Sequence, residues 1–269
     1  MPDNGFEATD VVVGQNQGGL RHERRTTQIR QLRQLKDEFL SLAAHEIRTP
    51  ITVIKAQAQL VERFQAQGAL KKEILDRSLR LFVLESDRLA RLCNDLLDIA
   101  RIDNGTLDVA RSGFEFIKLV RDVVRKINEA NGGEQERIGL TVDCEEQLVI
   151  ADVERTERVL YSLLSNALRY SPNGGIVSAT ISQRNGQAVF SVRDNGIGIP
   201  SDKIAEIFER YYQAHQTGLK GPSGLGIGLY VSQEIVKRMG GCMTVKSEGI
   251  GQGAEFSFTV PLVQDNFDK

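Results

Sequence analysis

A regular repeat of mostly apolar residues between positions 75 and 100 constrains the fold more than any other feature of the sequence. Its members follow one another at alternating spacings of four and three: Leu75, Leu79, Phe82, Ser86, Leu89, Cys93, Leu96 and Ala100. A heptad repeat of this kind keeps one stripe of an α-helix facing a partner, as in coiled coils and four-helix bundles. The repeat therefore predicts a long helix, which the turn signal "IDNG" at 102–105 ends.

A second helical stretch precedes this one and begins near Gln28. Apolar residues recur at spacings of three and four from Leu32 to Val61, and "AQGA" around Gly68 interrupts the pattern. Two long helices joined by a short loop form a hairpin, which cannot bury both apolar stripes alone. We therefore expect a homodimer in which two hairpins build a four-helix bundle. A monomeric hairpin packed on the rest of the chain is the alternative.

The pattern changes from about Leu107 onward, where strand-like and helix-like segments are mixed. Amphipathic helices are expected at 114–127, 153–171 and 229–239, with Asp152 as the N-cap of the second. Alternating apolar residues predict strands at 139–146, 147–152, 176–184, 188–194, 242–248 and 254–260. This mixture predicts an α/β two-layer sandwich with a mixed sheet.

These patterns divide the chain into four parts. Residues 1–27 lack apolar periodicity, which predicts a disordered or fraying lead-in. The helical hairpin is expected at 28–103, a linker at 104–112 and the α/β domain at 113–263.

Composition excludes several classes of partner. The formal net charge is −2, so there is no overall basic footprint and nucleic acid is not an expected partner. No apolar run reaches the roughly 18 residues that a membrane span needs, and the polar start is no secretory signal. The three cysteines, Cys93, Cys144 and Cys242, are far apart and form no CxxC motif. We therefore expect a cytoplasmic protein with reduced thiols.

The stretch "SLAAHEIRTPITV" (41–53) places a histidine on the outer face of the first helix. His45 lies about 200° around the helix from both Ala43 and Ile47, and so points away from their apolar stripe. Pro50 has no N–H to donate to the carbonyl of Glu46, which predicts a bend beside the histidine. The segment begins like the zinc motif HExxH, but Thr49 stands where the second histidine is needed, so a zinc site is excluded.

An exposed imidazole is nucleophilic at its unprotonated nitrogen. Glu46 beside it could bond the other ring nitrogen and accept a proton. From this segment alone, an exposed histidine without a role is an equally good interpretation.

Two glycine-rich segments, "DNGIGIP" (194–200) and "GPSGLGIGLY" (221–230), suit the close approach of a phosphate chain to the backbone. Neither matches the phosphate-binding loop GxxxxGK[ST] or opens a dinucleotide-binding unit. Asp194 is the more informative residue, because a carboxylate on a rigid loop can accept a hydrogen bond from the exocyclic amine of adenine.

Taken together, six motifs in order resemble the cytoplasmic part of a two-component sensor histidine kinase, over about residues 30–263. The matching segments are "FLSLAAHEIRTPITVI" (H-box), "DVERTERVLYSLLSNALRYSP" (N-box), "DNGIGIP" (G1 box), "IFERYYQ" (F-box), "GLGIGL" (G2 box) and the final "GQGAEFSF". The resemblance implies a Bergerat-type ATP-binding sandwich that follows a dimeric phosphoacceptor bundle.

The resemblance also implies residue roles. His45 would be the phosphoacceptor, Glu46 its acid–base neighbour, and Thr49 would position a hydrolytic water in a member that is also a phosphatase. ATP and Mg²⁺ would be bound, with Asn166 as the Mg²⁺ ligand. The remaining nucleotide-site residues would be Arg169, Tyr170, Asp194, Gly196, Gly198, Phe208, Gly224, Gly226, Gly228 and Leu229, and residues 212–223 would form a mobile lid.

The sequence departs from the family pattern at Ser162, at Gln213 and at Ala254, and the last, which stands where threonine is frequent, is expected to have little effect. Ser162 stands where kinases of this family usually have asparagine and related ATPases have a water-activating glutamate. Gln213 stands where an arginine often ends the F-box, and Arg210 is a candidate to replace its charge.

The implied function is ATP-dependent phosphorylation of His45 and transfer to an aspartate of a separate response regulator receiver domain. No recognisable sensor domain fits in the lead-in, so we expect an unknown upstream partner or a longer chain. An ATP-binding conformational module without phosphotransfer is the alternative.

Overall fold

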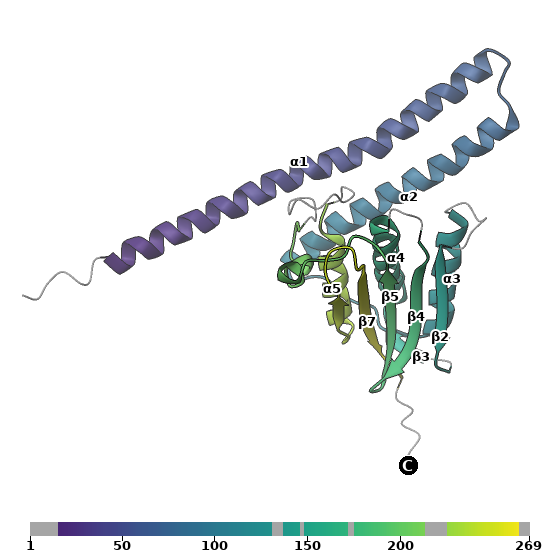
Figure 1. Cartoon of the computed structure of the whole chain (residues 1–269). Coiled ribbons are helices and arrows are strands. Elements are labelled where there is room, and N and C mark those ends of the chain that lie inside the picture. Colours follow the sequence, from purple (N-terminus) through teal and green to yellow (C-terminus); the bar gives the residue numbers. More distant parts are fainter. Residues whose placement is uncertain (1–15, 131–136, 146–147, 172–174, 213–224, 264–269) are drawn as a thin grey trace, which may run out of the picture. The chain divides into compact units, whose positions relative to one another are not determined.

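The computed structural model describes residues 16–130, 137–145, 148–171, 175–212 and 225–263, with side chains from residue 40 onward (Figure 1). The chain divides into two compact units, residues 1–46 and 47–269, and the boundary falls inside the first helix.

Two long helices form the N-terminal part, as the apolar repeats predict. Helix α1 spans Asn16–Ala66 and helix α2 spans Lys72–Asp103. Gly68 between them has a φ of +63°, which favours glycine and explains why the helix ends there. Helix α1 begins at Asn16 rather than near Gln28. It therefore includes part of the segment for which the sequence predicts a disordered lead-in.

The predicted apolar stripe of α2 lies largely on the surface of the single chain. Leu75 and Leu79 are exposed, although both are large apolar side chains. Helix α1 contacts α2 beside this stripe: the Gln57 amide donates a hydrogen bond to the buried Ser78 hydroxyl at 2.8 Å. The heptad positions thus remain available for a further partner.

A five-stranded mixed sheet with the order β2-β4-β5-β7-β6 forms the centre of the C-terminal part. Only the β2–β4 pair is parallel, and the other pairs are antiparallel. The strands are β2 (Ile138–Asp143), β4 (Val177–Arg184), β5 (Gln187–Asp194), β6 (Met243–Lys246) and β7 (Ala254–Pro261). A separate antiparallel pair consists of β1 (Ser112–Glu115) and β3 (Leu148–Ala151).

Three helices form the second layer: α3 (Phe116–Ala130), α4 (Val153–Tyr170) and α5 (Gly228–Arg238) (Figure 1). Two short 3₁₀ helices, Ser201–Lys203 and Glu206–Phe208, precede α5. Alternate residues of β4, β5 and β7 are buried, which gives the sheet one covered face. The ring of Phe258 in that core lies 6.1 Å from Phe116 and 5.6 Å from Phe190, centroid to centroid. The predicted two-layer α/β sandwich is confirmed.

The structure differs from the sequence prediction at the start of this sandwich. The amphipathic pattern predicts a helix that includes Phe114, whereas Phe114 lies in strand β1 opposite Val149 of β3. Pairing with a distant strand gives the backbone hydrogen-bond partners that local periodicity cannot reveal.

Candidate functional site

The H-box segment lies within α1, and its side chains alternate in exposure as the helical geometry predicts. His45 and Thr49 are exposed, whereas Glu46 and Pro50 are buried. The Thr52 hydroxyl donates a hydrogen bond to the carbonyl of Arg48 at 2.8 Å, a local contact that is common beside helix distortions. The His45 side chain is therefore exposed on a helix in which Pro50, in the next turn, has no backbone N–H to donate.

Helix α4 carries the N-box residues on a firmly anchored helix. Asp152 caps its start and accepts a hydrogen bond from the Arg155 amide at 3.0 Å, as predicted. Asn166 and Tyr170 lie one turn apart and are half-buried, and Arg169 is exposed. Burial raises the pKa of the Tyr170 phenol, and the Arg169 charge opposes this shift.

The loop after β5 carries the residue expected to recognise adenine. Asp194 ends β5 with 4% of its surface exposed, and its carboxylate accepts a hydrogen bond from the Gly196 amide at 2.8 Å. Burial raises the pKa of this carboxyl above the ordinary value, although the amides of Gly196 and Ala254 oppose the shift. Each carboxylate oxygen can accept more than one hydrogen bond, so this buried carboxylate can still accept from a ligand donor.

The end of α4 and this loop lie against each other. The Ile197 amide donates to the carbonyl of Tyr170 at 3.2 Å. A Cβ atom on Gly196 would stand 2.0 Å from the same carbonyl oxygen, so only glycine fits. The structure thus brings together Tyr170, Asp194 and Gly196, which lie in separate motifs of the sequence.

The G1 loop also contacts the final glycine motif. Gly198 has a φ of +69°, and a Cβ atom there would stand 1.9 Å from the carbonyl oxygen of Gly249. The Gly251 amide donates to the Ile197 carbonyl at 2.7 Å. These contacts fix the two loops as one backbone surface.

Ser247 is a structural residue of the site that the sequence analysis did not find. Its hydroxyl accepts from the Ile199 amide at 3.0 Å and donates to the Gly253 carbonyl at 2.6 Å. One side chain therefore joins the G1 loop to the final glycine motif. A single serine after a short strand gives no signal of this role in the sequence.

The G2 motif leads into α5 beside the F-box. Gly226 has a φ of +66°, and its carbonyl accepts from the Tyr211 amide at 3.0 Å. Gly228 opens α5, and a Cβ atom there would lie 3.3 Å from the Ser162 hydroxyl oxygen of α4. Leu229, in the first turn of α5, is half-buried. Ser162, the departure from the family pattern, therefore faces the G2 motif directly.

Phe208 anchors the other side of this region, because its ring packs edge-on against Phe256 with centroids 6.5 Å apart. Gly224, Gln213 and nearly all of the expected lid lie outside the described residues. The contacts above join the C-terminal half of α4 to the loops around Asp194 and Gly226, the region in which the sequence motifs predict a nucleotide site.

For the metal, the described part of the chain contains no group of three or more His, Cys, Asp or Glu residues placed to hold an ion. Asn166, the Mg²⁺ ligand that the resemblance implies, is half-buried on α4, and its side-chain carbonyl is the kind of oxygen ligand that Mg²⁺ binds. No helix among the described residues has the length and apolar character needed to cross a bilayer.

Two family models match the chain. The His Kinase A (phospho-acceptor) domain matches residues 35–105, and the histidine kinase-, DNA gyrase B- and HSP90-like ATPase matches residues 151–264. All described residues of the candidate site, from His45 to Gly253, fall within these two ranges.

Curated relatives carry both regions in longer chains. The sensor histidine kinase YkoH of Bacillus subtilis is 36% identical over 218 residues, which are 81% of this chain and 46% of that protein. The sensor protein SrrB of Staphylococcus aureus is 28% identical over 86% of this chain and 39% of its own length. The chain thus spans less than half the length of these relatives.

Solved structures share the fold. Full-length ShkA in complex with AMPPNP is 28% identical, with a TM-score of 0.57 over 84% of this chain and 46% of that one. The Acinetobacter baumannii histidine kinase AdeS is 23% identical, with a TM-score of 0.54 over 81% of this chain and 98% of that one.

Proposed function

Because this chain belongs to the two-component sensor histidine kinases, we propose that it transfers the γ-phosphoryl group of ATP to His45. In the proposed division, residues 28–103 form the dimerisation and phosphoacceptor domain and residues 104–112 the linker. Residues 113–263 form the catalytic domain. The observation that carries the proposal is the buried Asp194 carboxylate on a loop built from glycines, beside the C-terminal end of α4.

In this reaction the unprotonated ring nitrogen of His45 attacks the γ-phosphorus. A nitrogen–phosphorus bond forms while the bond from the γ-phosphorus to the bridging oxygen breaks, which releases ADP. Glu46 accepts the proton from the other ring nitrogen. Transfer of this kind depends mainly on positioning and charge neutralisation.

The catalytic domain would hold the nucleotide through the residues described above. Asp194 accepts from the adenine amine and Tyr170 covers the ring, while Phe208 anchors the base of the lid. Arg169 and the glycines Gly196, Gly198, Gly224, Gly226 and Gly228, with Leu229, complete the site. Asn166 would bind Mg²⁺, which neutralises phosphate charge when bound.

Three partners follow from this function. A second copy would complete the four-helix bundle through the exposed apolar stripe of α2. A response regulator receiver domain would accept the phosphoryl group on aspartate, and an unknown sensor or upstream partner would supply the signal. We place these reactions in the cytoplasm.

The decisive experiment uses γ-labelled ATP and Mg²⁺ with the wild type, His45→Gln and the matched control His22→Gln. Acid-labile, base-stable label is expected in the wild type and the control, and none in His45→Gln. Label that survives in His45→Gln contradicts the assignment of the acceptor. Bound nucleotide without any label favours the conformational module and directs attention to Ser162 and Gln213.

Phosphatase activity toward the regulator is a second proposed activity of the same site. Thr49 lies exposed one turn beyond His45, where its hydroxyl can orient a water molecule. Thr49→Ala should keep autophosphorylation and slow dephosphorylation of the phosphorylated regulator. Equal dephosphorylation rates for wild type and variant reject this activity.

A further inference from the structure

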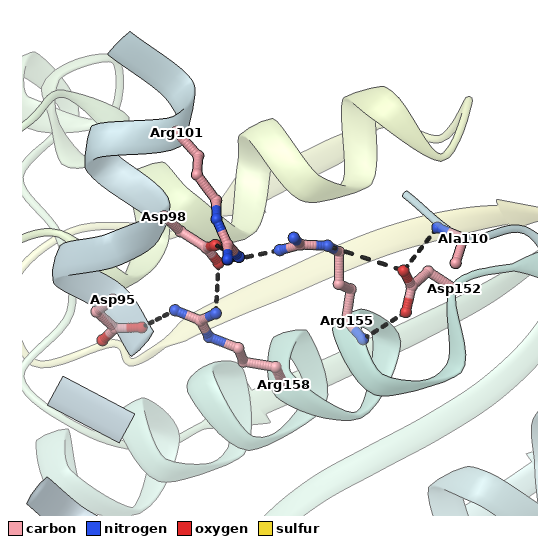
Figure 2. A network of polar contacts seen from close by, with 7 residues as sticks. All are labelled: Asp95, Asp98, Arg101, Ala110, Asp152, Arg155 and Arg158. Carbon is pink, nitrogen blue, oxygen red and sulfur yellow. Dashed lines mark hydrogen bonds and ion pairs between the residues drawn. The ribbon is translucent and has the colours of Figure 1, made fainter. Parts of the chain in front are cut away.

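Two carboxylates on α2 meet two arginines on α4 (Figure 2). Asp95 and Asp98 lie one turn apart in the last third of α2, and Arg155 and Arg158 lie one turn apart near the start of α4. The matching spacing lets both pairs face each other at once.

The four side chains form a connected set of ion pairs. Arg158 donates to Asp95 at 2.5 Å and also to Asp98, while Arg155 donates to Asp98 at 3.0 Å. Arg101 of α2 completes the surroundings of Asp98 at 3.4 Å. Arg155 and Arg158 are thus both bound to α2.

Burial makes this contact costly to break. The Asp98 side chain is only 1% exposed, so its charge depends on the arginines for compensation. Burial also raises the pKa of Asp95, which the Arg158 charge opposes. Removing one partner by substitution would leave a buried charge unpaired, so substitutions at these positions should strongly weaken the contact.

The same region holds the chain that connects the two helices. The Ala110 amide donates to the Asp152 carboxylate at 2.8 Å, and Leu107 is buried. The Asp152 carboxylate in turn contacts both the backbone amide and the guanidinium of Arg155. The linker is therefore fixed to the start of α4, beside the ion pairs.

A second tie joins α2 to the region of the F-box. Arg210 contacts Asp103 at the end of α2, stacks 4.6 Å from the centre of the Tyr230 ring and donates to its hydroxyl at 2.5 Å. The amide of the next residue, Tyr211, donates a hydrogen bond to the carbonyl of Gly226 in the G2 motif. While this tie is closed, an acidic residue of α2 neutralises a cation next to the proposed phosphate loop.

We propose that Asp95, Asp98, Arg155 and Arg158 form an ionic latch that holds the catalytic domain on α2, and that the latch must open for His45 to be phosphorylated. The second half of this statement rests on the proposed function. Helix α2 lies in the phosphoacceptor match and α4 in the ATPase match, so the latch joins the two domains.

The direction of the effect follows from Arg210. In the latched arrangement Asp103 competes with nucleotide phosphate for this cation, so the arrangement is the restrained one. Opening the latch should therefore speed phosphorylation of His45 and strengthen nucleotide binding, because Asp103 then no longer competes for Arg210.

Two latch variants and one matched control test the proposal in the full chain. The variants are Asp95→Asn with Asp98→Asn, and Arg158→Gln. The control is Glu157→Gln. Glu157 also lies on α4, next to Arg158, but its ion pair is with Lys126 of α3. Thermal melting and AMPPNP binding identify any variant that fails to fold, and the single Arg158→Gln substitution keeps the test valid if the double variant is lost.

The first readout is hydrogen–deuterium exchange of the linker peptide 104–111 without nucleotide. Exchange should be at least about tenfold faster in both latch variants, because loss of a buried ion pair shifts the open population by that order or more. The second readout is the initial rate of His45 labelling at saturating ATP, which should rise several-fold. The control should match the wild type in both.

The outcomes separate the latch from the kinase function. Linker exchange equal to the control overturns the latch itself. Faster exchange with slower labelling shows that the contact belongs to the phosphorylating arrangement, which overturns the requirement for opening. A wild type that takes no label rejects the proposed function instead, and the exchange readout still decides whether the latch exists.

Discussion

Asp194 and Gly196 close a two-residue turn in which the glycine amide donates to the aspartate carboxylate at 2.8 Å. This bond is made by Oδ1, and the proposed adenine contact is assigned to the other oxygen, Oδ2. In Asp194→Asn the second position becomes an NH₂ donor, which would oppose the amine of adenine. We expect nucleotide affinity to fall about 100-fold, measured by titration with AMPPNP. An unchanged affinity would show that Asp194 does not recognise the base.

The same substitution should stabilise the empty protein at neutral pH. Burial raises the folded-state pKa of Asp194 above its ordinary value of 3.8. The unfolded chain therefore loses this proton at a lower pH than the folded protein, and the wild type loses stability as the pH rises from 3.8 through the folded-state pKa. Asparagine carries no charge and avoids this loss. Thermal melting without nucleotide should therefore give a higher Tm for Asp194→Asn at pH 7, and the difference should vanish below pH of about 3.8. A lower Tm at pH 7 contradicts the assigned cause.

Gly198→Ala should destabilise the catalytic domain by about 3 kcal/mol or more, because the new Cβ meets the Gly249 carbonyl. Gly186→Ala is the matched control, since Gly186 has nearly the same φ, +71°, but open space around its Cα. The control should cost only about 1 kcal/mol for the left-handed backbone. Urea unfolding measures both. Equal losses would mean that the contact with Gly249 is unimportant.

Ser247→Ala should weaken both the fold and nucleotide binding. The Ile199 amide and the Gly253 carbonyl lose their shared partner, at a cost of about 1–3 kcal/mol. Ser191→Ala is the control, because Ser191 bonds only Ser257 on the sheet, at 3.1 Å. AMPPNP affinity should fall several-fold in Ser247→Ala and stay constant in the control. The same affinity in both variants would separate Ser247 from the site.

Leu79→Glu should convert the proposed dimer to a monomer. Leu79 and Leu84 are both 51% exposed on α2, but Leu84 lies about 140° around the helix, off the heptad stripe. Leu84→Glu is therefore a control with the same residue, helix and exposure. Light scattering after size exclusion should give half the wild-type mass for Leu79→Glu alone. Dissociation by both variants, or by neither, would place the dimer interface elsewhere.

Local chemistry accounts for the elements that the sequence predicts well. The heptad spacing predicts α2, Asp152 predicts the start of α4, and Gly68 predicts the end of α1. Each of these signals acts within a few residues of the chain. The hairpin between β4 and β5 has a similar signal, since Asn185 and Gly186 both have positive φ in its two-residue turn.

The features that the sequence analysis missed depend on contacts between distant residues. Strand β1 exists because β3, more than 30 residues later, supplies its backbone partners. Ser247 and Gly253 become important only when their loop meets Ile199. The pairing of Asp98 with Arg158 likewise has no local signal, because acidic and basic residues are common on any helix surface.

Helix α4 has a consequence for thermodynamic linkage. Its first turns hold Asp95 and Asp98 through two arginines, and its last residue, Tyr170, holds the loop that carries Asp194. Both contacts are therefore made by the same helix, so a movement of α4 affects both. Coupling between two binding equilibria is reciprocal. If a nucleotide loosens the contact between α2 and α4 by some factor, then holding α2 against α4 must weaken the binding of that nucleotide by the same factor. A signal that moves α2 would then set the ATP concentration at which the protein responds.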